Sequence, residues 1–411
     1  MLDHFYSEPK VLQRCRSGPL GPQLEQFAKL LKEAGYSPLS GQDKLRVVDQ
    51  LNQWLAAKRS KLQQLNDKQI RAFQLYRCKR RTSHHGESAT LTLFLHMLRR
   101  SDQIPDAPHP IPNNPIDLLV RDYSKFLIQE RNLSQITLYH RLPIVRQFLS
   151  RSFRSAKVRL NTLQARDVSR FVLGAVRDQR RDYCQLVTTT LRSFLDFLYQ
   201  NGRLKRCLRA AVPAVASGYS SELPSFLEPK QVEQLLRSCD RGSLCGRRDY
   251  AILLLLARLG LRVHEVRGLT LDDLSWESGE LLVRGKRGRE DRLPLPPDVG
   301  GAIADYLKNG RPRCSCREVF LRLPAPHKGM VGPTISGIVE RALTRAGISS
   351  THKGGHLLRH SLATRMLRGG ASLAQIGQVL RHTRVDTTEI YARVDKKALR
   401  ALAQPWPGGA R

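Results

Sequence analysis

The sequence predicts a mainly helical protein in which an α+β block at the C-terminal end carries a small antiparallel sheet. Two observations predict this fold class. Apolar residues recur every three or four positions over most of the chain, which is the period of a helix buried on one face. Short apolar runs flank a glycine-bounded turn near residues 281–295, where they indicate a hairpin. With 411 residues, the chain has room for two or three domains with cores of their own.

The charge of the chain is strongly positive. Lysines and arginines number 69 against 36 aspartates and glutamates, so the formal net charge is +33. This balance is unusual for an enzyme of small-molecule metabolism. It indicates a polyanionic partner, which is nucleic acid in the first place and an anionic membrane surface in the second. Hydrophobic residues make up 41% and charged residues 26%, a composition that excludes a disordered or fibrous chain.

Several features predict a protein of the cytoplasm. The longest purely apolar run, 251–257, is far shorter than the ~20 residues of a membrane-spanning helix. The first residues lack the basic and apolar regions of a secretory signal. The eight cysteines are scattered, which suits reduced thiols better than a disulfide framework. Cys314 and Cys316 form the one close pair, but no second pair of ligands follows, so no zinc site is expected.

The first predicted domain covers residues 1–110 and is helical. Its apolar residues recur at helical spacing in two sets, Phe27, Leu30, Leu31 and Leu45, Val48, Leu51, Leu55. A basic stretch lies at 77–81. Five prolines crowd 105–115, which indicates a linker to the next domain.

The second predicted domain, 115–210, is a bundle of four helices. Pro115 opens the first helix, Ser134 caps the second, and Asn201-Gly202 ends the fourth. Their apolar faces comprise Ile116, Leu119, Val120, Tyr123, Phe126 and Leu127; Leu138, Leu142, Val145, Phe148 and Leu149; Val168, Phe171 and Val172; and Leu186, Val187, Leu191, Phe194, Leu195 and Leu198. Residues 151–210 contain 14 lysines and arginines against 4 aspartates and glutamates. Most helix charge is merely solvated, but this excess of one sign favours contact with phosphates.

The two helical domains share a weak pattern. At an offset of 98, Leu51 falls on Leu149, Leu65 on Leu163, Ile70 on Val168, and Phe73 on Phe171. A duplicated bundle would produce this match. Helical periodicity in two unrelated bundles would produce much of it too, so both interpretations stay open.

The third predicted domain, 223–411, follows a second linker at 211–224. Glu228-Pro229 begins a helix, and 251–259 is predicted to be a buried helix. A further amphipathic helix is predicted by Ile335, Ile338, Val339, Ala342, Leu343 and Ala346.

Strands of this domain are predicted at 281–284 and 293–295, around the turn Gly285-Lys286-Arg287-Gly288. A third strand is predicted at 319–321.

Four short segments of the third domain carry residues that can act on a phosphate. In the first segment, Arg262 and Glu265 lie one helical turn apart and share a face. An exposed pair of this kind is common and is worth under about 1 kcal/mol. Arg262 follows a strongly apolar helix, however, so we expect it to be half buried. An arginine held by a carboxylate presents planar donors that match phosphate oxygens.

The other three segments hold a lysine, histidines and a tyrosine. Lys286 lies on the predicted turn, where most lysines serve only solubility. His356, Arg359 and His360 share a face near a helix N-terminus, an end favourable to anions, and helical spacing alone does not tell which histidine points into a site. His382 and Tyr391 border the last predicted helices, and a single histidine or tyrosine at helical spacing usually belongs to a core.

Together the four segments fit one kind of reaction. They supply two arginines, a lysine, histidines and one tyrosine, without a carboxylate cluster for a metal or a glycine-rich nucleotide loop. Metal-free chemistry on a phosphodiester needs positive donors around the phosphate and a nucleophile. We therefore predict that Tyr391 is the nucleophile and that no metal ion or other cofactor takes part.

The segments and their order resemble those of the tyrosine recombinase, or phage integrase, family. The resemblance is carried by Leu259-Gly260-Leu261-Arg262-Val263-His264-Glu265, Gly285-Lys286, His356-Leu357-Leu358-Arg359-His360, Leu380-Arg381-His382 and Tyr391. It is firm over 223–400 and fair over 115–210. It implies a catalytic tyrosine recombinase domain behind a helical core-binding domain. Residues 1–110 are then an extra helical extension, whose role stays open among DNA binding, subunit contact and duplication.

The resemblance implies a reaction and its main actors. Tyr391 attacks the scissile phosphate of DNA, forms a 3′-phosphotyrosyl link and releases a 5′-hydroxyl, without metal or ATP. Arg262 and Arg359 match the two arginines that bind the phosphate. Lys286 matches the lysine that protonates the leaving oxygen.

The resemblance also implies roles for the remaining polar residues. His356 matches the acid/base histidine near the nucleophile, and His382 matches the second histidine, on the phosphate. Glu265 would orient Arg262, and His360 is expected to be structural.

The sequence departs from the family pattern at two positions. Arg381 and Arg287 stand where glycine is common. Both add positive charge, and no catalytic residue type is missing, so we expect an active enzyme.

The resemblance implies double-stranded DNA as the partner, held in a clamp of the second and third domains. A homotetramer on DNA is expected, or an assembly with related recombinases, acting in the integration and recombination of a mobile element. Leu399 and Leu402, past the tyrosine, are expected to pack on a neighbouring subunit, with packing in cis as the alternative. The rival functions are a type IB topoisomerase, a catalytically idle DNA-binding protein of the same fold, and an RNA-binding protein.

Overall fold

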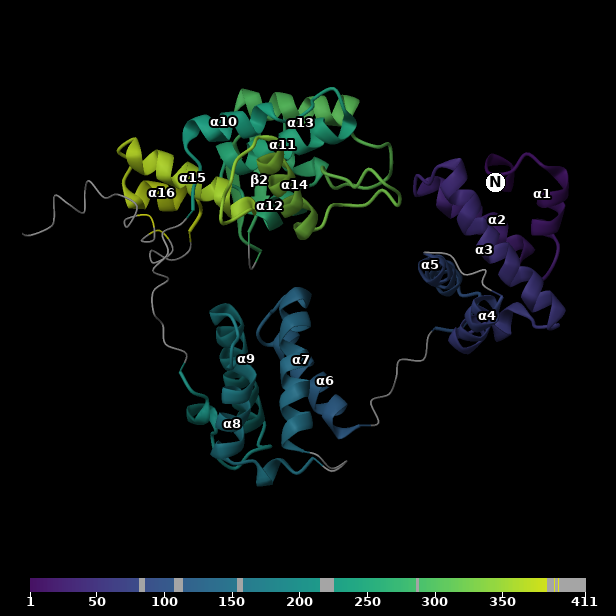
Figure 1. The fold of residues 1–411 in the computed structure, drawn as a ribbon, viewed down its shortest axis with the longest axis horizontal. Coiled ribbons are helices and arrows are strands. Elements are labelled where there is room, and N and C mark those ends of the chain that lie inside the picture. The colour runs from purple at the N-terminus through teal and green to yellow at the C-terminus, as the bar shows by residue number, and fades with distance from the viewer. Residues whose placement is uncertain are drawn as a thin grey trace, which may run out of the picture. The chain divides into compact units, whose positions relative to one another are not determined.

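The fold is described by a computed structural model for residues 1–80, 86–106, 114–153, 158–214, 225–285, 288–382, 388 and 391. This part of the chain holds sixteen α-helices and one three-stranded antiparallel sheet, which confirms the predicted fold class (Figure 1). The chain divides into two units, Pro108–Ser221 and Met1–Ala107 with Glu222–Arg411. Each of the three predicted domains contains a separate apolar core among the described residues, and the domain boundaries stay a prediction.

The N-terminal helices enclose a core of their own. Phe27, Leu31, Leu45, Val48, Leu51 and Leu55, which the helical spacing selected, are all fully buried. α3 is the long central helix, and α1, α2 and α5 pack against it. The helices are α1 (Pro9–Arg16), α2 (Gly21–Glu33), α3 (Pro38–Ala57), α4 (Asp67–Lys79) and α5 (Glu87–Arg100).

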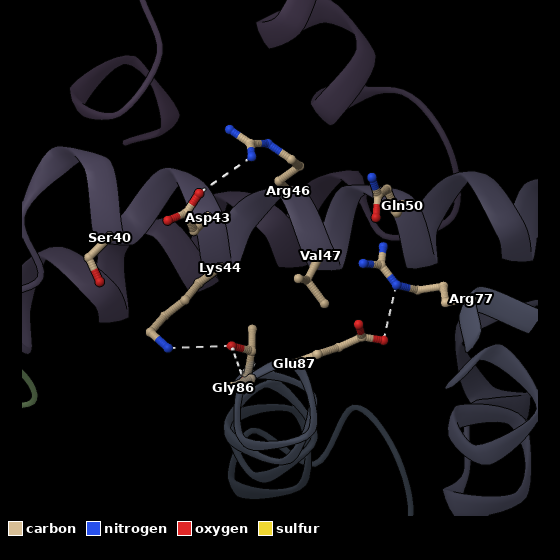
Figure 2. A pocket seen from close by; sticks show the side chains of 10 residues that line it. Ser40, Asp43, Lys44, Arg46, Val47, Gln50, Arg77, Gly86 and Glu87 are labelled. Atoms are coloured by element: carbon tan, nitrogen blue, oxygen red, sulfur yellow. Dashed lines mark hydrogen bonds and ion pairs between the residues drawn. The ribbon is translucent and has the colours of Figure 1, made fainter. Parts of the chain in front are cut away.

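A polar pocket of about 320 Å³ lies among α3, α4 and α5 (Figure 2). On one side of it Arg77 Nε lies 3.0 Å from Glu87 Oε1, and both side chains are about 4% exposed. On another side Lys44 Nζ donates a hydrogen bond to Thr90 Oγ1 over 3.3 Å. Charges of both signs line the pocket, so it favours neither an anion nor a cation.

The described part of the second unit contains four helices, as predicted. Asn114 and Ser134 cap the first two by accepting hydrogen bonds from backbone N–H groups of the first turn. All its fully buried aromatic residues, Tyr123, Phe148 and Phe194, come from the predicted apolar faces. The helices are α6 (Pro115–Gln129), α7 (Gln135–Ser152), α8 (Ala165–Val176) and α9 (Arg181–Gln200).

In the C-terminal block, α11 is the central helix. Residues 251–256 are at most 1% exposed, which confirms the predicted buried helix. α10, α12, α13, α14 and α15 pack around it (Figure 1). The helices are α10 (Pro229–Arg237), α11 (Leu244–Arg258), α12 (Val263–Gly268), α13 (Pro297–Asn309), α14 (Gly332–Arg345), α15 (Gly355–Arg368) and α16 (Leu373–Val379).

The sheet has the predicted hairpin but a different third strand. β2 (Glu280–Arg284) pairs antiparallel with β3 (Glu290–Pro294), and β1 (Leu274–Ser275) pairs with the other edge of β2. The prediction of a strand at 319–321 was wrong. That segment is buried, but its one bridge joins Leu321 to Gly329, and the bridge from Glu318 to Thr270 lies just before it. Because the segment is buried, it has the apolar composition of a strand. No neighbouring segment pairs along its length, so it does not form one.

Two expectations concern what the described residues lack. None of the described helices combines the length and the apolar character that a bilayer crossing requires. Within the described ranges, no three histidine, cysteine or acidic side chains gather as metal ligands. All eight cysteines are free, and Cys316 Sγ is 3.1 Å from the His327 carbonyl oxygen.

Candidate active site

Five of the six predicted site residues lie in the described part of the C-terminal block. Arg262 precedes α12, and His356 and Arg359 lie in the first turns of α15. His382 and Tyr391 follow α16. The sixth, Lys286, lies outside the described residues, as do Leu399, Leu402 and Arg287. The Gly285 N–H donates to the Arg289 carbonyl oxygen over 2.7 Å next to the strand ends that flank the lysine.

A buried carboxylate holds two arginines. Glu265 is 2% exposed. Its carboxylate accepts hydrogen bonds from the backbone N–H and Nη1 of Arg262, both over 2.8 Å, and from Nη2 of Arg381 over 2.9 Å. Burial opposes ionisation of this carboxyl, but the Arg262 N–H and the two guanidinium charges outweigh it and hold its pKa below the usual value. The pair is therefore not the surface ion pair that the spacing alone allowed.

The second predicted phosphate-binding arginine is fixed by two carbonyl groups. The guanidinium of Arg359 donates to the carbonyl oxygens of Gly260 and Leu380. Its side chain is almost fully buried, and burial together with the charges of Arg262 and Arg381 lowers its pKa to about 10. Gly260 has φ +57°, and a Cβ there would come within 2.7 Å of Leu380. Glycine thus lets the loop before Arg262 approach the segment before His382.

Arg381 occupies a backbone conformation that favours glycine. Its φ is +54°, a left-handed conformation that glycine adopts without strain. The arginine compensates for this strain through its bond to Glu265, and Nη2 of Arg262 donates to the Arg381 carbonyl oxygen over 3.4 Å. The departure from the family pattern therefore adds a third guanidinium to the site and connects both loops.

Tyr391 lies against these charges and is shielded from solvent. Its side chain is 1% exposed, in an apolar cluster with Leu362, Ile376 and Leu380. Its hydroxyl lies 2.9 Å from Nδ1 of His360, so the two share a hydrogen bond. Burial raises the pKa of Tyr391 to about 12, and the positive charges of Arg359 and Arg262 act against that rise.

Two histidines lie next to the tyrosine, and a third lies next to one of them. The His382 ring is parallel to the Tyr391 ring at 6.4 Å, and its Nδ1 lies 2.7 Å from Thr388 Oγ1. The His356 ring lies next to the His360 ring, with 6.2 Å between ring centres. Burial and the neighbouring positive charges lower the pKa of His360 and of His382 to about 4, and they lower that of His356 as well. All three are neutral at pH 7, so each ring has a nitrogen free of a proton.

The arrangement can bind an anion and deliver a phenol to it. Three guanidiniums face one carboxylate here, so the site carries an excess of positive charge that a phosphodiester would balance. The neutral histidines can accept protons, and the Tyr391 phenol can act as a nucleophile.

Sequence reasoning missed two contributors. Arg381 was noted only as a departure, yet it is the second partner of Glu265. His360 was expected to be structural, yet it is the histidine in contact with the Tyr391 hydroxyl. The i, i+4 spacing of His356 and His360 put both on one face without telling which one reaches the tyrosine.

Comparisons with known proteins show what the chain as a whole is similar to. The model of the phage integrase family matches residues 225–398. y4rA of Sinorhizobium fredii, an integrase/recombinase by name, is 42% identical over 413 residues that cover all of both chains.

A second relative matches about two thirds of the chain. The tyrosine recombinase XerD of Listeria monocytogenes is 31% identical over 290 residues, which are 69% of this chain and 96% of XerD. Among solved structures, the XerH site-specific recombinase in a post-cleavage complex with its difH substrate superposes with a TM-score of 0.55 at 18% identity. The match covers 69% of this chain and 83% of that one, and it shows a common fold.

Proposed function

Because the chain belongs to the phage integrase family of tyrosine recombinases, we propose that Tyr391 cleaves DNA through a covalent 3′-phosphotyrosyl bond. The protein is a tyrosine-type site-specific recombinase that acts on DNA, cleaving and rejoining its strands. Its finer role is the integration and recombination of a mobile element.

The proposed step conserves the energy of the bond it breaks. The Tyr391 oxygen attacks the phosphorus, the bond from phosphorus to the 5′-oxygen breaks, and the phenolic proton passes to a histidine. Lys286 gives a proton to the leaving 5′-oxygen. A 5′-hydroxyl from a partner strand later attacks the phosphotyrosyl bond and restores the tyrosine, so the cycle consumes neither ATP nor a metal ion.

One observation carries this proposal: the Tyr391 hydroxyl lies among histidines and within the field of both Arg262 and Arg359. The two arginines would neutralise the charge that develops on the phosphate oxygens. A donor of this kind typically contributes ~10²–10³ in rate. His356 and His382 serve proton transfer and hydrogen bonding to the phosphate.

Proton transfer out of Tyr391 is unfavourable before DNA binds. Burial raises the pKa of Tyr391 to about 12 and lowers that of His360 to about 4, so this histidine does not readily take the phenolic proton. A bound phosphodiester offsets the arginine charges that lower both pKa values, so it makes the histidines better proton acceptors without making the phenol more acidic.

The partners follow from this chemistry. Residues 115–210 and the C-terminal block bind double-stranded DNA, chiefly through its phosphates, and the active assembly is a homotetramer on DNA or an assembly with related recombinases. The protein works in the cytoplasm, on DNA.

A suicide substrate tests the proposal. This is a nicked duplex whose short cleaved strand diffuses away and leaves the protein attached to DNA. We expect a covalent adduct with the natural chain and none with Tyr391→Phe, which keeps its DNA affinity. Arg262→Ala and Arg359→Ala should abolish cleavage and weaken binding only modestly.

The outcomes separate the rival functions. An adduct retained by Tyr391→Phe would refute the assignment of the nucleophile. Equal loss of binding and cleavage in both arginine variants would show that the arginines serve docking or the fold. Relaxation of any supercoiled plasmid without a preferred site would identify a topoisomerase, and equal affinity for duplex RNA with no adduct would identify an RNA-binding protein.

A further inference from the structure

The N-terminal helices follow the same order as those of the second unit. Residues 21–104 run α2, α3, a 3₁₀ turn, α4, α5, and residues 115–204 run α6, α7, a 3₁₀ turn, α8, α9. The 3₁₀ turns, Leu62–Gln64 and Leu160–Thr162, begin 98 residues apart (160 − 62). The helices after them also begin 98 residues apart (165 − 67). Shared helical periodicity gives no reason for a 3₁₀ turn at the same point of two unrelated bundles.

The turns before α3 and α7 repeat in detail. Ser37 and Ser134 cap these helices, each by accepting a hydrogen bond from the backbone N–H three residues on. Two residues before each serine stands a residue with positive φ, Gly35 at 82° and Asn132 at 46°. Both pairs are 97 residues apart (134 − 37 and 132 − 35). Positive φ is uncommon outside glycine, so the same turn has been kept in both units.

The last helices match at an offset of 100. Their equivalent buried residues are Thr90 and Thr190, Leu91 and Leu191, Phe94 and Phe194, Leu95 and Leu195, and Leu98 and Leu198. Phe94 lies edge-on to Phe27 at 5.3 Å between ring centres, and Phe194 lies edge-on to Tyr123 at 5.1 Å. The correspondence therefore extends from helix order to the packing of individual rings.

The two interiors differ at the polar pocket. The positions of Arg77 and Glu87, which form the buried pair in Figure 2, correspond to Ala175 and Val187 at the offsets of their helices. Among these two sets of helices, the buried pair of the pocket thus occurs only in residues 21–104. Buried residues therefore differ between residues 21–104 and 115–204 at this place. Exposed residues that are alike in both segments are stronger evidence of a shared role.

Exposed basic residues recur at the offset of 98. The pairs are Lys61 and Arg159, Lys68 and Arg166, and Lys79 and Arg177. Lys68, Leu75 and Lys79 share one face of α4, because steps of 7 and 11 residues are close to whole helical turns. Leu75 is 64% exposed, and its counterpart Leu173 is 61% exposed. Exposed side chains do not hold a core together, so their recurrence indicates a common ligand.

The charge of residues 21–104 and of residues 115–204 indicates the same ligand. Residues 21–104 contain 15 lysines and arginines against 7 acidic residues, and residues 115–204 contain 16 against 7. Lysines and arginines spaced along a helix neutralise successive phosphates of a nucleic acid and release its counterions.

We propose that residues 21–104 are a second copy of the 115–204 unit and bind the phosphate backbone of duplex DNA through Lys61, Lys68 and Lys79. The proposal rests on the proposed function, in which the second unit contacts DNA. Leu75, between the two α4 lysines, adds an apolar contact for the deoxyribose of the strand.

The test uses K61Q/K68Q/K79Q in the full chain. Fluorescence anisotropy with a labelled DNA duplex at several salt concentrations gives the slope of log affinity against log salt. Each phosphate contact on B-DNA contributes about 0.9 to this slope. We expect the triple variant to lower the slope by about 2 to 3. The equivalent variant of the second unit, R159Q/R166Q/R177Q, should lower it by a similar amount.

A matched control removes the same charge elsewhere. K10Q/K32Q/R100Q changes three exposed residues that have no basic counterpart, since Lys10 precedes the repeat and the other two correspond to Ile128 and Gln200. We expect a change in slope of less than about 1. Circular dichroism verifies that each variant keeps its helices.

The outcomes separate this proposal from the proposed function. If K61Q/K68Q/K79Q behaves like the control while R159Q/R166Q/R177Q lowers the slope, the N-terminal copy does not bind DNA and the proposal is overturned. If the natural chain forms no covalent adduct, the proposed function fails, and the salt slopes still decide whether residues 21–104 bind DNA.

Discussion

The carboxylate of Glu265 is the element of the site whose removal has the most predictable effect. Glu265→Gln keeps the shape of the side chain and removes its charge. In the structure this carboxylate accepts three hydrogen bonds, from Arg262 twice and from Arg381 once. The amide retains one acceptor oxygen and turns an NH₂ group towards donors that need an acceptor.

The size of the effect follows from burial. Breaking a buried ion pair from one side costs about 3–5 kcal/mol, because the remaining charge stays buried without its partner. In a domain of this size each kcal/mol lowers the unfolding temperature by about 2–4 °C, so we expect a loss of about 6–12 °C for 3 kcal/mol. Arg262 also loses its orientation, and strand cleavage should slow by about 10²–10³ while DNA affinity changes little.

Thermal unfolding of the full chain and single-turnover adduct formation measure the two effects. Asp272→Asn is the matched control, because Asp272 pairs with Arg317 where both side chains are more than 60% exposed. A surface pair of this kind is worth less than about 1 kcal/mol. Glu265→Gln with the cleavage rate of the natural chain would refute the reasoning, since Arg262 would then need no carboxylate to be positioned.

Three further outcomes are expected. Because the folded-state pKa values of His360 and His382 are depressed to about 4 from 6.5, their contribution to stability is complete above pH 6.5 and is lost as the pH falls towards 4; unfolding temperatures measured from pH 7.5 to 4.5 should fall, and a flat profile would contradict the shifts. Arg77→Ala should destabilise the N-terminal unit by about 3–5 kcal/mol, and adding Glu87→Val, the residue type of the second unit, should restore most of it in urea unfolding; a double variant as unstable as the single one would show that the pair is not the cause. Strand cleavage should be unchanged in EDTA, and a requirement for added metal would overturn the proposed mechanism.

Local signals in the sequence predicted most of the helical framework. Ser134 before an apolar periodic run fixes where α7 begins, and 251–259 was predicted to be a buried helix because all its residues but Arg258 are apolar. The segment 319–321 shows the limit of this reasoning. Its apolar residues are buried as expected, but whether a buried segment joins a sheet depends on which neighbour lies beside it.

The site was predicted as a set of residues but not as a set of contacts. Arg262, Arg359 and Tyr391 were selected by type and order, and the structure brings them within electrostatic range. Arg381 reaches Glu265 from a segment more than 100 residues away. His360, rather than His356, contacts the tyrosine from about 30 residues away. Contacts between residues so far apart produce no periodic pattern in the sequence, so they could not be predicted from it.

The proposed nucleophile, Tyr391, is concealed in the absence of DNA. With 1% of its side chain accessible, the tyrosine cannot reach a phosphate that it meets by random collision. Burial raises the pKa of the hydroxyl to about 12, far above the ambient pH, so the phenol stays protonated and unreactive as well as hidden. An enzyme arranged in this way breaks no DNA strand until a rearrangement exposes the tyrosine.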